Sequence, residues 1–276
     1  MDSTAPDQVY VRRFDAFDRV LHGLLMLSFL GLAATGLPLL FSDEAWARAL
    51  ARVFGGFVVA GWLHRVCATL LIAVFLTHVT RVARRIVAGR EYGLLWGPHS
   101  MVPQPRDVRE LVQHLRWFVG LGARPRFERF TYWEKFDYWA VFWGMAVIGA
   151  SGLLLWFPEL FARILPGWVF NVALLIHGEE ALLAVGFIFT MHFFNGHLRP
   201  EKFPMDLVIF TGRVTAAELE EERPDEYARI RATAQLERLR VGPPPRWLRR
   251  LGRVVGTAAV TIGLILVTLI LYAVLT

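Results

Sequence analysis

The fold is decided by the stretch from Val172 to His197, VALLIHGEEALLAVGFIFTMHFFNGH. It is long and apolar enough to cross a bilayer as one helix, which takes about 20 residues. It nevertheless carries three histidines, His177 near one end and His192 and His197 near the other. Ionisable side chains inside a membrane span are costly and mark functional sites. The stretch therefore predicts a membrane helix that carries a site.

The whole chain has the composition of a multi-pass membrane protein. Of its 276 residues, 55% are hydrophobic and 20% are charged, which is too apolar for a soluble domain of this length. We assign the net charge of +6 to loops on one membrane side, so it does not predict nucleic-acid binding. The single cysteine, Cys67, excludes disulfides within the chain, cysteine-ligated iron–sulfur clusters and a Cys-x-x-Cys-His site for covalent haem. Residues 1–19 lack an apolar core and predict no cleavable signal.

Five apolar runs reach the length of a membrane helix. We therefore expect an all-α, polytopic membrane protein, with a four-helix bundle and a fifth, C-terminal transmembrane helix. The runs are Val20–Phe41, Phe57–Thr80, Phe136–Phe157, Val172–Phe194 and Val255–Leu275.

The distribution of Lys and Arg predicts the orientation, because cytoplasmic loops carry the excess of these residues. The link between the second and third runs has eleven, the link between the fourth and fifth has twelve, and the other two links have three together. We therefore expect a bacterial inner-membrane protein with its N-terminus in the cytoplasm and its C-terminus outside.

Three parts are expected along the chain: a membrane domain over residues 1–212, a cytoplasmic helical segment and linker over 213–254, and the C-terminal helix over 255–276. In the second part, Thr215 and Glu218 have capping-box spacing, and Pro224 begins another helical piece. Within the first part, residues 105–121 predict an amphipathic helix on the inner membrane surface. Its apolar stripe consists of Val108, Leu111, Val112, Leu115 and Val119.

The histidines of the second and fourth runs match in depth. His64 and His78 are 14 residues apart, or about 21 Å along a helix axis. His177 and His192 are 15 apart, or about 22 Å. Both runs cross in the same direction, so His64 meets His177 at an outer level and His78 meets His192 at an inner level. Two such levels favour two bis-histidine b-type haems in a four-helix haem-binding bundle.

The inner level allows other pairings. His22, at the inner start of the first run, can replace His78 as the partner of His192. Alternatively, His22 and His197 hold a third haem, so the expected count is two or three. Zinc is not favoured, because these spacings cannot bring two ligands of one helix onto one ion. A histidine in a span can also serve as a hydrogen-bonding group or in a proton path. His99 and His114, in the loop after the second run, are expected to be solvent or interface residues.

Other polar groups lie close to these histidines. Arg65, next to His64, is the candidate partner of a haem propionate at the outer level. A quinone site needs a proton-exchanging group near a haem. Glu179 and Glu180 are the candidates at the outer level and Asn195 at the inner level, and the sequence does not choose between them.

These residues resemble the cytochrome b subunits of membrane-bound formate dehydrogenases (the gamma subunit) and related quinone-linked reductases, over about residues 10–223. The resemblance is carried by RVLH at 19–22, LHR at 63–65, YWEKFDYW at 132–139, HGEEA at 177–181 and HFFNGH at 192–197. It is greatest to the branch in which the last motif is followed by Pro-Met-Asp, here within FPMD at 203–206, and which is usually partnered by multihaem c-type cytochromes.

The resemblance implies a four-helix di-haem core, menaquinone or ubiquinone as the lipid-soluble partner, and an electron-transfer subunit docked outside. It also implies that His22 and His192 ligate the inner haem and that His64 and His177 ligate the outer one. The chain departs from the family pattern in His78, in its fifth span and in the segment 215–241. His78 fits the other arrangement, in which each of two helices offers two histidines.

Together these observations predict an electron-transfer subunit of a quinone-linked oxidoreductase complex. It would carry electrons between the quinone pool and an extracytoplasmic redox subunit, such as a multihaem cytochrome c or an iron–sulfur protein. Two other classes remain open: a haem-containing membrane anchor without its own quinone site, and a proton or metal transporter that uses histidine and glutamate.

Overall fold

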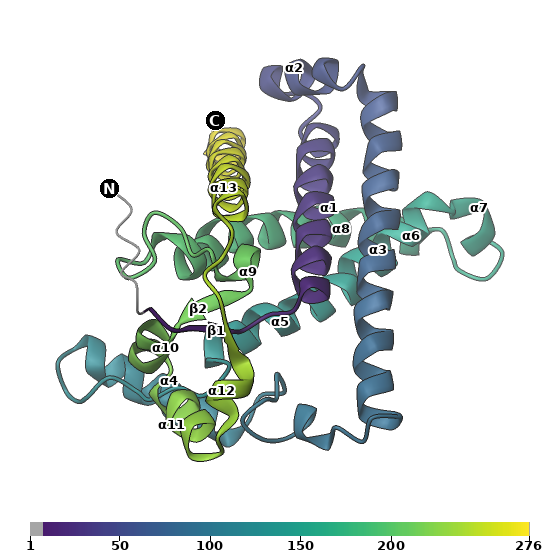
Figure 1. Cartoon of the computed structure of the whole chain (residues 1–276). Helices are drawn as coiled ribbons and strands as arrows, with labels where there is room; N and C mark the ends of the chain where they lie inside the picture. Colours follow the sequence, from purple (N-terminus) through teal and green to yellow (C-terminus); the bar gives the residue numbers. More distant parts are fainter. Residues whose placement is uncertain (1–7, 276) are drawn as a thin grey trace. The chain divides into compact units, whose positions relative to one another are not determined.

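The computed structural model describes residues 8–275, and the start of the expected N-terminal tail lies outside them. Within this part of the chain, five helical stretches are long and apolar enough to cross a membrane. The expectation of an all-α, multi-pass architecture is therefore confirmed. The stretches comprise α1 (Ala16–Leu40), α3 (Phe57–Val87), α5 with α6 (Tyr132–Trp156), α8 with its extension (Trp168–Leu198) and α13 (Arg246–Leu275), and Figure 1 labels these helices along the chain.

Most of these helices extend beyond the apolar runs that predicted them. Helix α3 continues from the end of its run at Thr80 to Val87, and α13 begins at Arg246, well before the run that starts at Val255. Arginine, which is frequent in both extensions, is a good helix former. Hydropathy therefore marks the part of a helix that lipid can cover, and not the ends of the helix.

Two of the spans contain π-helical turns. One turn, η2 (Met145–Gly149), joins α5 (Tyr132–Gly144) to α6 (Ala150–Trp156). Two more, η3 (Ile188–His192) and η4 (Phe194–Leu198), extend α8 (Trp168–Phe187). Such turns are rare and occur often at functional sites. Because a π turn changes the angle between successive side chains, the rotation of about 100° per residue of a regular α-helix does not hold between His177 and His192.

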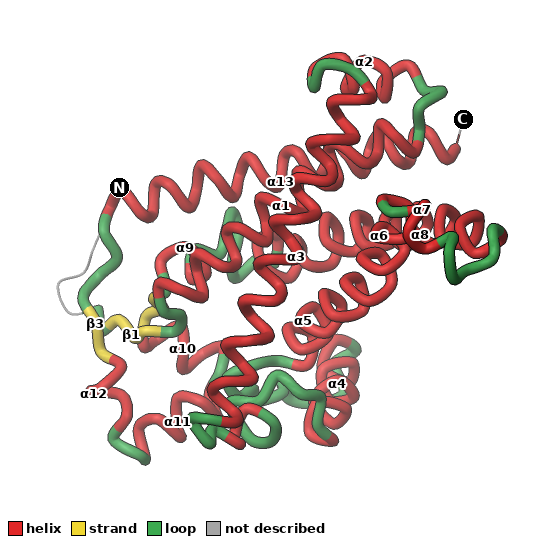
Figure 2. The backbone as a smooth tube through the Cα atoms, turned by 90° about the vertical axis from the view of Figure 1, so that its right-hand side faces the viewer, coloured by secondary structure: helices red, strands yellow, loops and turns green. Residues whose placement is uncertain are grey.

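The chain forms two compact units, and the membrane unit comprises Val20–Val79, Val141–Asp206 and the chain from Arg253 onward. In it, α1 lies beside α3 (Figures 1 and 2). Its core joins α1, the α8–η3 region and α13, which gives the fifth span a packing role. The buried residues of this core are Ala33, Leu37, Val185, Phe189, Phe193, Ala259 and Leu266.

The second, polar unit comprises the residues up to Arg19, Thr80–Ala140 and Leu207–Gly252. It contains a small antiparallel sheet in which β1 (Tyr10–Arg12) lies between β2 (Arg213–Thr215) and β3 (Arg240–Val241). Val11 pairs with Val214 on one side and with Arg240 on the other. The sequence did not predict this sheet, because strands of two or three residues are too short to show an alternating pattern.

Short helices complete the two units. Thr215 accepts a hydrogen bond from the backbone N–H of Glu218 (3.1 Å) at the start of α10, and Pro224 begins α11, so both expected helix starts are confirmed. The shorter helices are α2 (Ala45–Val53), η1 (Tyr92–Leu94), α4 (Pro105–Phe118), α7 (Pro158–Phe161), α9 (Val208–Thr211), α10 (Ala216–Glu222), α11 (Pro224–Ala232) and α12 (Gln235–Leu239).

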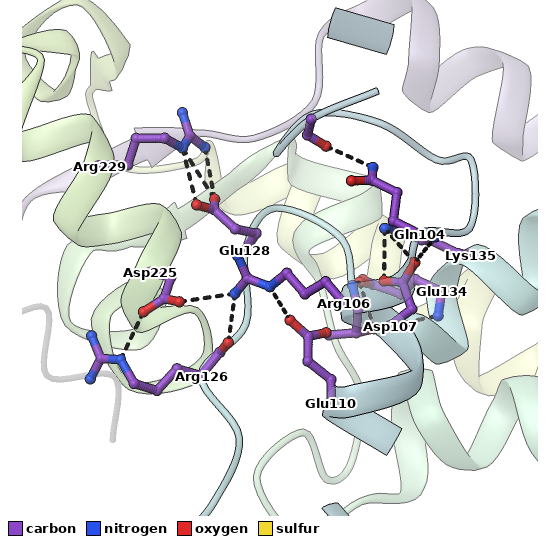
Figure 3. A network of polar contacts seen from close by, with 12 residues as sticks. Gln104, Arg106, Asp107, Glu110, Arg126, Glu128, Glu134, Lys135, Asp225 and Arg229 are labelled. Atoms are coloured by element: carbon purple, nitrogen blue, oxygen red, sulfur yellow. Dashed lines mark hydrogen bonds and ion pairs between the residues drawn. The ribbon is translucent and has the colours of Figure 1, made fainter. Parts of the chain in front are cut away.

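Helix α4 turns its polar side chains inward. Its expected apolar stripe is exposed, whereas Asp107, Glu110 and His114 are buried. Asp107 accepts a hydrogen bond from Lys135 (2.8 Å), and this pair belongs to the network of ion pairs in Figure 3. The network also links α4 to α11, because Arg106 contacts both Glu110 and Asp225. An exposed apolar face beside a satisfied polar one is the arrangement expected of a helix that lies on a membrane surface.

Of the two histidines of the polar unit that were expected at the surface or at an interface, His114 differs from expectation and His99 agrees with it. His114, expected at the surface or at an interface, is buried, stacks on Phe118 (ring centroids 4.5 Å apart) and lies 3.0 Å from the hydroxyl of Tyr132. Aromatic residues from two segments enclose it, which single-residue reasoning does not reveal. His99 is exposed and its Nε2 lies 3.1 Å from Arg229. Partial desolvation of the ring and this guanidinium lower the pKa of His99 below its usual value.

Candidate functional site

The first candidate pair consists of His64 on α3 and His177 on α8. Their ring centroids are 6.3 Å apart and the ring planes are inclined at 78°. The structure therefore brings together the two histidines that the sequence assigned to one depth.

The second pair consists of His22 on α1 and His192 at the end of η3. Their ring centroids are 6.5 Å apart, with an interplanar angle of 34°. The sequence left open whether His22 or His78 faces His192. In the structure the ring of His22 lies at this separation from His192, which is the pair that the resemblance implies.

Both separations fit two imidazoles on opposite sides of one metal ion. A metal–imidazole bond is about 2.0–2.1 Å long and the ring centre lies about 1.1 Å behind the nitrogen, so two axial rings are about 6.3 Å apart. Within residues 8–275, no group of three or more His, Cys, Asp or Glu side chains is placed to hold a metal ion. A haem needs only two, because the porphyrin itself supplies four nitrogens.

In each histidine of the first pair, Nδ1 has a hydrogen-bond partner on a neighbouring helix or turn, and Nε2 is left to bind a metal. Nδ1 of His177 donates to the carbonyl of Ile148 (3.0 Å), and Nδ1 of His64 lies 3.1 Å from the hydroxyl of Thr35. With the proton held on Nδ1, Nε2 keeps the lone pair that binds a metal. This donor chemistry fits a haem, in which each axial histidine offers one nitrogen to the iron.

The remaining histidines of the spans lie near the second pair or on α3. The Nδ1 atom of His197 is buried and has no hydrogen-bond partner among the described residues. The ring of His197 contacts Phe193 (5.9 Å between centroids), which in turn contacts His192 (6.3 Å). An unpartnered buried nitrogen leaves His197 available as a ligand. His78 lies on α3, 14 residues after His64.

Arg65 lies between two indole rings. Its guanidinium is 5.3 Å from the ring of Trp62 and 5.9 Å from that of Trp156, so it connects α3 to α6 through cation–π contacts. It follows His64 directly in the sequence, so it stays the candidate cation beside the His64–His177 pair.

The quinone candidates differ in their surroundings. Glu180 accepts a hydrogen bond from the indole N–H of Trp143 (3.1 Å), whose side chain is 61% exposed. Glu179 is exposed, and Asn195 is partly buried, with its backbone carbonyl accepting a hydrogen bond from Arg199 (3.0 Å). Of the three, Glu180 combines a fixed carboxylate, a large exposed apolar surface and a position one helical turn from His177.

Sequence reasoning missed several residues of this site: Thr35, Ile148, Ser151 and Trp143. A signal for two of them exists, because a hydroxyl residue directly precedes a glycine inside an apolar run at 35–36 and again at 151–152. Small and hydroxyl residues are so common in membrane helices that the pattern acquires meaning only beside the histidines.

No protein-family model matches the chain, and the search of curated proteins gives no match. The resemblance to quinone-linked cytochromes b therefore rests on the motifs of the sequence alone.

Proposed function

We propose that this protein is a membrane-embedded b-type cytochrome that transfers electrons between the quinone pool and a partner redox subunit. The observation that carries the proposal is the pairing of four histidines from α1, α3, α8 and η3 into two pairs. Each pair has the centroid separation of a bis-imidazole metal site. Two pairs on shared helices suit two redox centres in series better than they suit a single binding site.

The residues have distinct roles in this proposal. His64 and His177 hold one haem b, called here the outer haem, and His22 and His192 hold a second, the inner haem. Bound haem supplies a one-electron redox centre. The 15 residues from His177 to His192 set the centres about 22 Å apart along the helix. A third haem, on His197, remains part of the proposal.

The proposed orientation follows from charge. The two links rich in Lys and Arg face the cytoplasm of a bacterial inner membrane, together with the N-terminus, and the C-terminus lies outside. The outer haem then lies near the extracytoplasmic surface, where a multihaem cytochrome c or an iron–sulfur subunit would dock. Membrane lipid covers the apolar stripe of α4.

The quinone site is proposed at Glu180 and Trp143. Oxidation of a quinol releases two electrons and two protons. The electrons would pass one at a time to the outer haem. The carboxylate of Glu180 would take up the two protons in turn, passing the first to water outside before it takes the second. In quinone reduction the same groups act in reverse. A carboxylate inside a span is expensive unless it has such a task, and the exposed face of Trp143 offers an apolar approach from lipid.

Absorbance spectroscopy of the purified protein tests the proposal. We expect a reduced α-band and a pyridine-haemochrome ratio of two haems per chain, or three if His197 is a ligand. His64→Ala and His177→Ala should lose the same haem, and His22→Ala and His192→Ala the other. His99→Ala, which removes a histidine outside the spans, should keep all haems. A colourless protein from haem-replete cells, or four variants with full haem content, would refute the proposal.

Stopped-flow reduction by a short-chain quinol tests the quinone site. We expect Glu180→Gln to slow haem reduction by about 100-fold, the usual worth of a proton-transfer group, with the dithionite-reducible haem unchanged. Glu179→Gln, at the adjacent exposed carboxylate, is the matched control and should behave as the wild type. If quinol reduces no haem in the wild type, the protein is a haem-containing anchor instead.

A further inference from the structure

The two ligands of the proposed outer haem are held by neighbouring helices in the same way. His64 of α3 is held by α1, and His177 of α8 is held by α6 and the π turn before it. In each case the holding helix presents a hydroxyl residue directly followed by a glycine: Thr35–Gly36 and Ser151–Gly152.

The hydroxyl groups of Thr35 and Ser151 make the same two contacts. Thr35 donates its hydroxyl proton to the carbonyl four residues earlier, that of Gly31 (2.6 Å), and Ser151 does so to that of Val147 (2.7 Å). The oxygens, having given up their single proton, can only accept from the ring. They lie 3.1 Å and 3.2 Å from Nδ1 of His64 and His177.

A backbone carbonyl joins the hydroxyl at one of the two ligands. Nδ1 of His177 lies 3.0 Å from the carbonyl of Ile148, three positions before Ser151. The acceptors of both imidazoles thus lie on the Nδ1 side, and none of them competes for Nε2.

The glycines fix where the rings lie. A Cβ atom at Gly36 would be 2.9 Å from Cε1 and 3.2 Å from Nδ1 of His64. A Cβ atom at Gly152 would be 2.9 Å and 3.3 Å from the same atoms of His177. At these distances the ring must move. The Cε1–Nδ1 edge of each imidazole therefore lies close against a backbone from which a side chain is missing.

We infer that Thr35–Gly36 and Ser151–Gly152 are two copies of one positioning device, which orients the ligands of the outer haem and keeps their protons on Nδ1. The inference rests on the proposed function. Hydrogen bonds of this kind raise the basicity of a metal-bound imidazole, which stabilises ferric over ferrous iron. The device therefore acts on both ligands of the proposed outer haem, one from each holding helix.

Potentiometric titration and EPR spectroscopy of the purified protein test the inference. We expect Thr35→Val and Ser151→Ala each to raise the midpoint potential of the same single haem and to weaken its retention by about 10-fold. Thr35→Ser should restore the wild-type values. Thr69→Val is the matched control, because the Thr69 hydroxyl also bonds to a carbonyl four residues earlier on α3 and touches no histidine.

The glycine variants give the stronger test. Gly36→Ala and Gly152→Ala should each change or abolish the EPR signal of one haem, the same haem in both, while the other signal persists and reports a folded protein. The inference is overturned if the hydroxyl and glycine variants leave both haems as in Thr69→Val, or if the two halves of the device affect different haems. A wild-type protein without haem would instead refute the proposed function.

Discussion

Replacing Glu226 by glutamine should destabilise the polar unit by about 3 kcal/mol. Glu226 accepts hydrogen bonds from Arg13 (2.6 Å) and Arg129 (3.2 Å), and the side chains of Glu226 and Arg13 are only 5% and 6% exposed. Breaking such a pair leaves a buried charge without its counter-ion, which costs about 3–5 kcal/mol. The lower end applies, because glutamine still accepts one hydrogen bond and Arg13 also donates to the carbonyl of Arg129.

This loss should lower the melting temperature by about 10 °C, at 2–4 °C per kcal/mol for a protein of this size. The measurement is thermal unfolding in detergent. Glu237→Gln is the matched control, because the ion pair of Glu237 with Arg240 is loose (3.7 Å) and its side chains are 75% and 57% exposed. Such a pair contributes about 1 kcal/mol or less. If Glu226→Gln melts with the control, the buried pair is not what holds the unit together.

The same carboxylate predicts the direction of the acid response. Burial would raise the pKa of Glu226, but Arg13 and Arg129 outweigh it and hold the pKa below its usual value of 4.5. A carboxyl group with a depressed folded-state pKa contributes stability above its unfolded pKa and loses it as the pH falls through the folded value. The melting difference between wild type and Glu226→Gln should therefore be constant above about pH 4.5 and shrink below it.

Three further predictions concern the membrane and the haems. The two pairs should give two distinct EPR signals from ferric low-spin haem, because their ring planes are inclined at 78° and 34°. The anisotropy of such a signal rises as the two axial imidazoles approach perpendicular. A single signal would contradict this geometry. Arg65→Gln should lower the midpoint potential of the outer haem by removing a positive charge beside it, whereas Arg163→Gln, at an exposed arginine, should not. Membrane contact by the apolar stripe of α4 can be tested with a fluorophore on a single cysteine in a Cys67→Ala background. Brominated lipids in nanodiscs should quench the fluorophore at Val112→Cys and leave that at Gln113→Cys unquenched. Equal quenching would argue against membrane contact by the stripe.

The spans were predictable because the bilayer imposes a length and a hydropathy on every helix that crosses it. All five apolar runs became helices in the structure. The depth of His64 and His177 was predictable for the same reason, since helix rise alone sets it. That His22 lies beside His192 was not predictable in this way, because it depends on which helix packs against the end of α8.

The polar unit was the least predictable part. The sheet depends on contacts between segments about 200 residues apart, such as Val11 with Val214. The burial of His114 depends on aromatic residues of the segment 127–133 that close over α4. In both cases the stabilising partners are distant in sequence, whereas the spans carry their own signal in consecutive residues.

The positioning device explains why a repeated geometry leaves no repeat in the sequence. It requires one hydroxyl residue followed by a glycine on a holding helix, and one histidine on the next. The residues between hydroxyl and histidine differ in number, with separations of 29 from Thr35 to His64 and 26 from Ser151 to His177. One link contains helix α2 and the other contains α7, and the π turn η2 precedes only the second hydroxyl. The hydroxyl and the glycine beside each imidazole therefore constrain two residues on each holding helix and leave the rest of both helix pairs free to diverge.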